Sequence, residues 1–339
     1  MRLGVDSYSL RWQGWDAFQL LEYSARLALD NVHFSERGNF ASLDEGYLRL
    51  LKRRADELGL AVEVGMGSFD RHASSFRPEY GTGEEQLSAM LRAAKVVGSP
   101  VVRCFLGTQA ERLGPIPIQQ HVEECVRTLK TVAPLARDLG VKIAVENHGG
   151  IDLLARELRA LVEEAGTDYV GVCLDTGNPA YAGEDPVVSA EVLAPYTVSS
   201  HVRDTRVWAV PDGAMAQWVP LGQGNVDLRR IIQILAEQAP EAPVDLEIIT
   251  SIGPKSIPYL DPESDFWKMY PDMLARDFAR FVALAQKGKP EPLEQLALPP
   301  TGRALPEGEL GERLKAQQRR HFEESVTYAR EVLGIGERA

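Results

Sequence analysis

The sequence predicts an α/β protein that folds as a (β/α)₈ TIM barrel with a C-terminal helical extension. Eight short runs rich in β-branched residues alternate with longer amphipathic runs over residues 1–286, close to the ~250 residues typical of such a barrel. No glycine-rich phosphate loop follows the first strand, which disfavours the alternative of a doubly wound sheet. We therefore divide the chain into a barrel, 1–286, and a proline-rich linker with a helical arm, 287–339.

The elements follow in a regular order. Strands are expected near 3–7, 31–35, 60–65, 101–106, 141–147, 170–175, 197–202 and 244–249. Helices are expected near 16–28, 44–58, 83–97, 117–139, 151–165, 186–194, 227–238 and 271–286. Gly59, Gly98 and Gly140 each follow a helical run, as helix C-termini favour. The alternation of strand and helix gives eight consecutive β–α units.

The C-terminal region differs in composition. Residues 287–306 contain five prolines and predict a linker, whereas 310–333 carry a loose apolar stripe and predict a helix. Such a stripe buries against any apolar surface. The sequence leaves open whether it packs on its own barrel or forms a subunit contact.

Charge and cysteine content restrict the partners and the compartment. The net charge of −12 argues against nucleic acid and against a polybasic membrane surface. Three cysteines without a CxxC motif indicate reduced thiols. The N-terminal run has no signal-peptide pattern, and no apolar stretch approaches membrane-spanning length. We expect a cytoplasmic protein.

Residues 144–150, AVENHGG, place a glutamate at the end of an apolar strand, and three later strands repeat this pattern. Because side chains alternate across a strand, the apolar residues that face the helices determine which neighbours face the barrel axis. On the fifth to eighth strands, the inward residue near the C-terminal end is Glu146, Asp175, His201 and Glu247, respectively. Barrel enzymes place their chemistry at this rim.

Three carboxylates at one barrel mouth repel one another and raise each other's pKa. A divalent cation relieves that repulsion. Carboxylate oxygens with one imidazole suit Mn²⁺, Mg²⁺ or Co²⁺, and also accept Zn²⁺. We therefore predict one divalent metal ion at these four residues. The competing explanation is four unrelated polar residues at strand ends.

The quartet and its surroundings, VENHGG, CLDTGNP, HVRD and LEI, resemble the xylose isomerase-like TIM barrels. This group includes ketose 3-epimerases, inosose dehydratase, lyases and decarboxylases of oxidised sugars, and endonuclease IV. The stretch LGQGNVDL at 221–228 adds to the resemblance, which covers about residues 1–286. It implies Mn²⁺ or a similar ion on the four matching residues. It also implies that Glu146 and Glu247 form a catalytic proton-transfer pair on opposite faces of a sugar substrate.

One position departs from the epimerase pattern. The epimerases carry a histidine three residues after the metal-binding aspartate, where this chain has Asn178. An asparagine can hydrogen-bond a hydroxyl group but cannot supply a cationic imidazole beside an enolate. The epimerases also carry an arginine shortly after the ligand histidine, a place that Arg206 or Arg203 could fill. We expect Asn178 and Arg206 to contact substrate.

Other polar residues also fall at strand positions whose side chains are expected to face the barrel axis. His148 lies just past the fifth strand and is a candidate acid or substrate contact, unless it is an exposed loop histidine. Arg103 and His33, on the fourth and second strands, are candidate substrate contacts, with a buried structural role as the alternative. Lys142 and Asp245 lie earlier on their strands, hence deeper in the barrel. We expect their opposite charges to pair beneath the predicted metal.

Two loops, 203–226 and 250–270, exceed the usual length and follow strands that carry predicted ligands. Lys255 and Trp267 lie on the second loop and are candidate substrate contacts. Aromatic residues on such loops can stack on sugar rings, but they can equally pin the loop to the barrel.

The sequence thus predicts a metal-dependent sugar isomerase or epimerase that forms an enediolate on a keto-sugar or sugar acid. A lyase on the same scaffold, whether a dehydratase, a deglycosidase subunit or a decarboxylase, is the alternative. A DNA-repair endonuclease is disfavoured by the charge and by the lack of extra histidines for a trinuclear zinc cluster. A homo-oligomer or a small partner subunit remains open.

Overall fold

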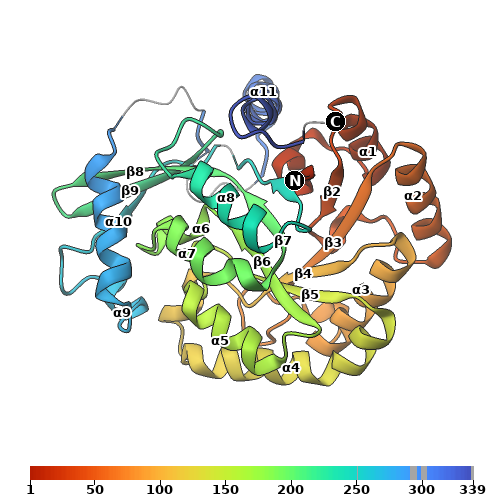
Figure 1. The fold of residues 1–339 in the computed structure, drawn as a ribbon, viewed down its shortest axis with the longest axis horizontal. Helices are drawn as coiled ribbons and strands as arrows, with labels where there is room; N and C mark the ends of the chain where they lie inside the picture. The colour runs from red at the N-terminus through yellow and green to blue at the C-terminus, as the bar shows by residue number, and fades with distance from the viewer. Residues whose placement is uncertain (250, 291–295, 299–303, 337–339) are drawn as a thin grey trace.

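Eight parallel strands close into one barrel in the computed structural model, as the sequence predicts (Figure 1). The structure describes residues 1–249, 251–290, 296–298 and 304–336. The barrel strands are β1 (Leu3–Asp6), β2 (Asn31–Phe34), β3 (Ala61–Ser68), β4 (Val101–Phe105), β5 (Lys142–Glu146), β6 (Val170–Asp175), β7 (Thr197–Val202) and β10 (Val244–Leu246). Strand β10 pairs with β1, Leu3 opposite Val244, which closes the barrel.

Helices lie between successive strands and cover the outside of the barrel (Figure 1). They are α1 (Ala17–Arg26), α2 (Glu45–Glu57), α3 (Gly83–Val97), α4 (Ile118–Leu139), α5 (Ala155–Ala165), α6 (Asn178–Tyr181), α7 (Pro186–Leu193) and α8 (Leu228–Gln238). Short 3₁₀ helices add η1 (Ser7–Gln13), η2 (Arg37–Asn39), η3 (Pro78–Tyr80), η4 (Gln109–Leu113) and η5 (Ala194–Tyr196). The start of α3 is set by a capping box between Thr82 and Glu85, and its end by Gly98 at φ 76°.

The C-terminal helix α11 (Glu309–Glu331) packs on its own barrel. It lies between α8 and α1 (Figure 1) and contacts η1 and β10. Its apolar stripe, including Phe322 and Val326, is buried in the main core, and Tyr23 of α1 donates a hydrogen bond to Glu323 at 2.7 Å. Of the two alternatives for this helix, the structure shows intramolecular packing. Three linker prolines, 292, 299 and 300, lie outside the described residues.

The two long loops are partly ordered into a second layer, which corrects the expectation for 203–226 and 250–270. Strands β8 (Asp204–Val210), β9 (Gly213–Val219) and β11 (Lys255–Ile257) form an antiparallel sheet. Helix α9 (Asp265–Met269) follows, and α10 (Ala275–Lys287), expected as the eighth barrel helix, packs on β8 instead. These elements share a separate apolar core. Residue 250 lies outside the described residues.

No helix among the described residues combines the length and the apolar character needed to cross a membrane.

Candidate metal centre

The C-terminal ends of four neighbouring barrel strands bring the predicted quartet together. Glu146 on β5, Asp175 on β6, His201 on β7 and Glu247 just after β10 each offer one ligand atom, and these atoms lie within 4.8 Å of one another. Pairing of β6 with β7 sets Asp175 opposite His201. All four residues are buried. The alternation of inward and outward residues therefore placed the four side chains correctly.

The quartet fits a divalent cation. His201 Nδ1 lies 3.1 Å from Glu146 Oε2 and 3.7 Å from Glu247 Oε2. Both His201 Nδ1 and Glu146 Oε1 are buried without a hydrogen-bond partner among the described residues. Buried polar atoms are almost always satisfied, so unpaired ligand atoms that converge point to a missing partner. Three carboxylates and one imidazole suit Mn²⁺, Mg²⁺, Co²⁺ or Zn²⁺.

Two buried arginines flank the quartet. Arg103 on β4 forms an ion pair with Glu146. Arg203, between β7 and β8, forms an ion pair with Asp175 and lies 2.5 Å from Glu247 Oε2. Burial would raise the pKa of Glu146, but Arg103 and His201 outweigh it and hold that pKa well below its usual range. Burial dominates at Glu247 and raises its pKa, although Arg203 and His201 oppose the shift. The two glutamates are thus electrostatically unequal.

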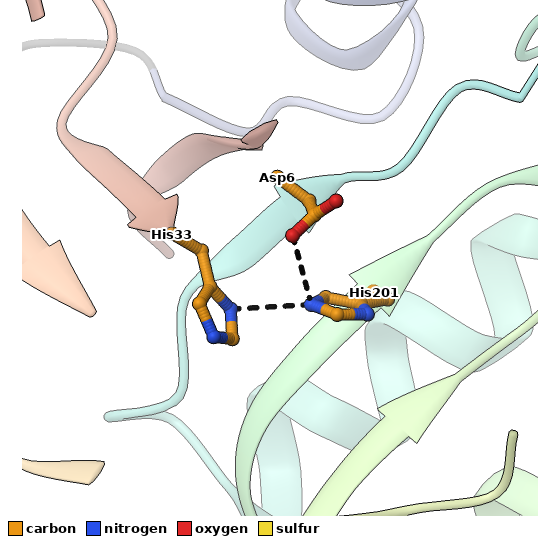
Figure 2. A group of neighbouring side chains, drawn as sticks. All are labelled: Asp6, His33 and His201. Atoms are coloured by element: carbon orange, nitrogen blue, oxygen red, sulfur yellow. Dashed lines mark hydrogen bonds and ion pairs between the residues drawn. The ribbon is translucent and has the colours of Figure 1, made fainter. Parts of the chain in front are cut away.

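The second ring nitrogen of His201 faces Asp6 and His33, as Figure 2 shows. Its Nε2 atom lies 3.2 Å from His33 Nδ1 and 3.4 Å from Asp6 Oδ2. Asp6 at the end of β1 was not predicted, although it follows Gly4 in the inward phase of that strand. His33 is therefore fully buried and contacts a quartet residue inside the barrel, which is the buried structural alternative considered for it.

His148 sits beside the quartet. Its ring stacks on Phe105 with a centroid distance of 3.6 Å, and Nδ1 donates a hydrogen bond to the Gly107 carbonyl at 2.7 Å. Burial lowers the pKa of His148 to about 4. The ring is therefore neutral at pH 7, with its lone pair on Nε2.

Asn178 braces backbone rather than facing the rim. Its Oδ1 accepts a hydrogen bond from the Gly150 amide, and its Nδ2 donates one to the Asn147 carbonyl, both at 3.0 Å. The side chain is 1% exposed. Asn178 thus ties the turn after β5 to the start of α6, and both of its polar atoms are already used.

Of the two arginines considered after the ligand histidine, Arg203 reaches the quartet and Arg206 does not. Arg206 on β8 donates to the Gln223 carbonyl, from Nη2 at 2.7 Å. Arg203 lies over the ring of Trp218, 4.3 Å from its centroid. The expectation of Arg206 is therefore wrong. Arg203 follows His201 by two residues, so the phase of β7 is a signal that could have identified it.

Lys255 and Trp267 hold the second layer in place. Lys255 donates a hydrogen bond to the Gln109 side chain, and Trp267 Nε1 donates to the Tyr259 carbonyl at 3.0 Å. Trp267 also packs edge-on against Phe266 and Phe278. Of the two alternatives for these aromatics, pinning of the segment is the one that the structure shows at Trp267.

The expected pairing of Lys142 with Asp245 beneath the predicted metal site is wrong. Lys142 Nζ donates to the Thr167 carbonyl at the outer end of β5, because a long amine at the first residue of a strand can reach solvent. Asp245 accepts hydrogen bonds from Asn31 Nδ2 at 2.9 Å instead.

A family model described as xylose isomerase-like TIM barrel matches residues 13–268. The chain belongs to this family. Membership in the xylose isomerase-like TIM barrels confirms the resemblance drawn from the strand-end motifs. It also agrees with the closed eight-stranded barrel.

Similar proteins include enzymes with different reactions. The chain is 21% identical over 211 residues to 3-oxo-isoapionate decarboxylase of Pectobacterium atrosepticum, covering 60% of this chain and 69% of that one. D-Psicose 3-epimerase from Clostridium cellulolyticum H10 superposes with a TM-score of 0.60 at 16% identity, over 84% of this chain and 96% of that one. A xylose isomerase-like TIM barrel protein from Mycobacterium smegmatis, in complex with magnesium, gives 0.56 at 14% identity over 84% and 96%. At these identities the structural likeness shows the fold alone.

Proposed function

We propose that the protein is a divalent-metal-dependent sugar isomerase or epimerase that acts on a keto-sugar or sugar-acid derivative. One observation carries the proposal. Two glutamates of opposite pKa shift, Glu146 and Glu247, share a buried four-residue ligand cluster with unpaired atoms. Mn²⁺ is the preferred ion, and a cytoplasmic location suits the three unpaired cysteines.

A divalent ion held by the quartet would polarise a substrate carbonyl and stabilise enediolate charge. The chain's own residues supply proton transfer and orientation. Glu146 and Glu247 come from β5 and β10, which β6 and β7 separate in the barrel. They therefore approach a substrate from different sides, so one removes the α-proton and the other returns a proton.

Two further groups can bind the substrate oxygens. Arg203 Nη1 is buried without a hydrogen-bond partner among the described residues, so it can donate to a developing oxyanion. The Nε2 atom of the neutral His148 can accept a hydroxyl proton. The aromatic face of Trp218, packed on Arg203, helps to exclude water from the site.

A lyase is the second candidate, and the similarity to 3-oxo-isoapionate decarboxylase favours it. Asn178, with its amide committed to backbone, supplies no imidazole of the kind expected in an epimerase. On this candidate the same ion and arginines stabilise the enolate left by loss of CO₂ or of a β-leaving group. A homo-oligomer or a small partner subunit is compatible with either candidate.

Glu146→Gln and Glu247→Gln test the proposal. Each substitution preserves size and one oxygen ligand but removes the base, so we expect metal to be retained and turnover to fall at least about 100-fold. The assay is a screen of ketoses and 3-oxo-sugars in deuterated water with measurement of substrate α-hydrogen exchange. An isomerase whose second proton transfer is blocked still exchanges that hydrogen, whereas a decarboxylase shows no exchange before turnover. Wild-type turnover in both metal-loaded variants would contradict the assigned acid–base roles.

A further inference from the structure

A second cluster of ligand-type side chains fills the barrel beneath the quartet. His33 on β2, Glu63 on β3 and Asp245 on β10 each offer one atom, and these atoms lie within 4.8 Å of one another. His33 Nδ1 is 3.7 Å from Glu63 Oε2 and 3.6 Å from Asp245 Oδ2. All three residues are at most 1% exposed.

The cluster has an excess of buried acid. Asp6, Glu63 and Asp245 each have a carboxylate oxygen within 3.7 Å of a ring nitrogen of His33 or His201. Among the described residues, no lysine or arginine nitrogen lies within 4.0 Å of these three carboxyl groups. A buried carboxylate without a counter-charge is strongly unfavourable. The quartet differs, because two arginines form ion pairs with its carboxylates.

Several polar atoms here also lack partners. Glu63 Oε2 accepts from Ser199 Oγ at 2.5 Å, but Glu63 Oε1 has no hydrogen bond among the described residues. The same is true of Asn31 Oδ1, Asp6 Oδ2 and His33 Nε2. Buried polar atoms are rarely left without a partner. Of these atoms, Glu63 Oε1 belongs to a carboxyl group of the cluster itself, and its lack of a hydrogen bond indicates a missing partner there.

The N-terminal face of the barrel offers a path to this cluster. A hollow of about 270 Å³ is lined by Arg2, Asn31, Glu63 and Pro100, among others. Above it, a Cβ atom added to Gly4 would meet Asp245 Oδ1 at 1.9 Å. Glycine at this position therefore makes room for the Asp245 carboxyl group inside the barrel.

We propose that His33, Glu63 and Asp245 bind a second divalent cation inside the barrel, reached from its N-terminal face. One imidazole nitrogen with two carboxylates suits Mn²⁺ or Zn²⁺. The ion neutralises the excess acid and takes His33 Nδ1. His201 Nε2 then donates its hydrogen to Asp6 Oδ2, the neighbour drawn in Figure 2. A histidine ligand whose other nitrogen is held by a carboxylate has its orientation fixed. The proposal goes beyond the proposed function, because it concerns a second ion.

The test is metal content per folded chain after loading with excess Mn²⁺ and removal of free ion. We expect two ions in the wild type and one in Glu63→Gln/Asp245→Asn, whose amides keep the shape of both side chains. Asp175→Asn is the matched quartet variant and should retain the deep ion. A second measurement uses the wild type alone and so does not depend on the folding of a variant. The second equivalent of Mn²⁺ should broaden the electron paramagnetic resonance signal of the first.

Each other outcome is decisive. Suppose that the wild type binds one ion, which Asp175→Asn loses and Glu63→Gln/Asp245→Asn keeps. That result overturns the deep site and leaves the proposed function intact. It also shows that the deep carboxyl groups share protons. One ion with the reverse pattern supports the deep site and contradicts the proposed function. If the double variant does not fold, the electron paramagnetic resonance titration of the wild type decides. In that titration, a single Mn²⁺ signal without broadening at saturation overturns the proposal.

Discussion

The imidazole of His148 has one nitrogen committed to the fold, and the ring lies close enough to Glu146 for the two to interact electrostatically. The Nδ1 atom donates to Gly107, while proximity to Glu146 opposes the effect of burial on the pKa of the ring. A neutral imidazole next to an anionic cluster can accept or pass a substrate hydroxyl proton without itself carrying charge.

We therefore predict that His148→Gln lowers turnover about 100-fold while metal content is unchanged, because the ring is not one of the four ligands. Turnover and bound metal are measured on the same preparation. The exposed His72 provides a control, since His72→Gln should behave as wild type. Equal activity in both variants would make His148 a loop residue without a chemical role.

At this scale, strand phase predicted most of what the structure shows. Counting in twos along β5, β6 and β7 gave the three predicted ligands on those strands. It was not applied beyond His201, so Arg206 was expected at the site where the structure has Arg203. It failed for Lys142, because a residue at the open end of a strand can turn its side chain to solvent. It could not reveal the hydrogen bonds of Asn178, since these depend on how two loops meet.

Among the elements, α5 and α7 are linked by one buried carboxyl group. Glu184 accepts a hydrogen bond from Ser189 of α7 at 2.6 Å and from the amide of Ala155, the first residue of α5, at 3.3 Å. Burial raises the pKa of Glu184 to about 7. Folded chains therefore keep the proton at pH values where unfolded chains release it.

The sign of the resulting pH dependence follows from linkage. The contribution of Glu184 to stability is fully present below about pH 4.5 and is lost as pH rises through about 7, on the order of 3 kcal/mol in total. We predict that Glu184→Gln, which cannot ionise, loses less stability than the wild type between pH 5 and pH 8. Chemical denaturation at several pH values measures this. Exposed Glu331 provides the control substitution Glu331→Gln. An unchanged pH slope in Glu184→Gln would show that this carboxyl group ionises normally.

The elements outside the barrel were the ones that sequence patterns missed. Residues 204–219 hold two runs with β-branched and aromatic residues, among them Val207 and Trp218, on either side of the turn residues Pro211, Asp212 and Gly213. An Asp-Gly turn between two such runs is typical of a β-hairpin. Because a loop between barrel strands was expected here, the hairpin was not predicted. The antiparallel pairing of β11 with β9 joins segments about 40 residues apart, and nothing local in the sequence encodes it.

For the whole molecule, the C-terminal helix α11 packs into the core of the barrel. Helix α11 supplies buried side chains to the main core, whereas α10 covers the second layer. A helical pattern of the right length after the eighth strand predicted the barrel but could not determine which of two later helices closes the ring. That choice depends on long-range burial rather than on local periodicity.

We predict that Phe322→Ala destabilises the protein by about 3–5 kcal/mol, the usual cost of a large buried ring. Phe322 is 0% exposed and packs near Tyr23. Thermal unfolding and solution mass are measured together. Leu310→Ala, on an exposed part of the same helix, should change neither. A shift of Phe322→Ala toward smaller mass without a change in melting temperature would instead indicate a subunit contact.

The central claim is that Glu146, Asp175, His201 and Glu247 hold a divalent ion that the reaction needs. The most direct measurement compares bound metal and turnover in the wild type and in Asp175→Asn, which keeps the Oδ1 atom that accepts from the Gly177 and Asn178 amides. Asp168→Asn, at an exposed ion pair, serves as the control. We predict that Asp175→Asn loses about one ion per chain together with its turnover, and that added Mn²⁺ restores turnover to demetallated wild type but not to this variant. Equal metal content in the two proteins, or full turnover in demetallated wild type, would contradict the account.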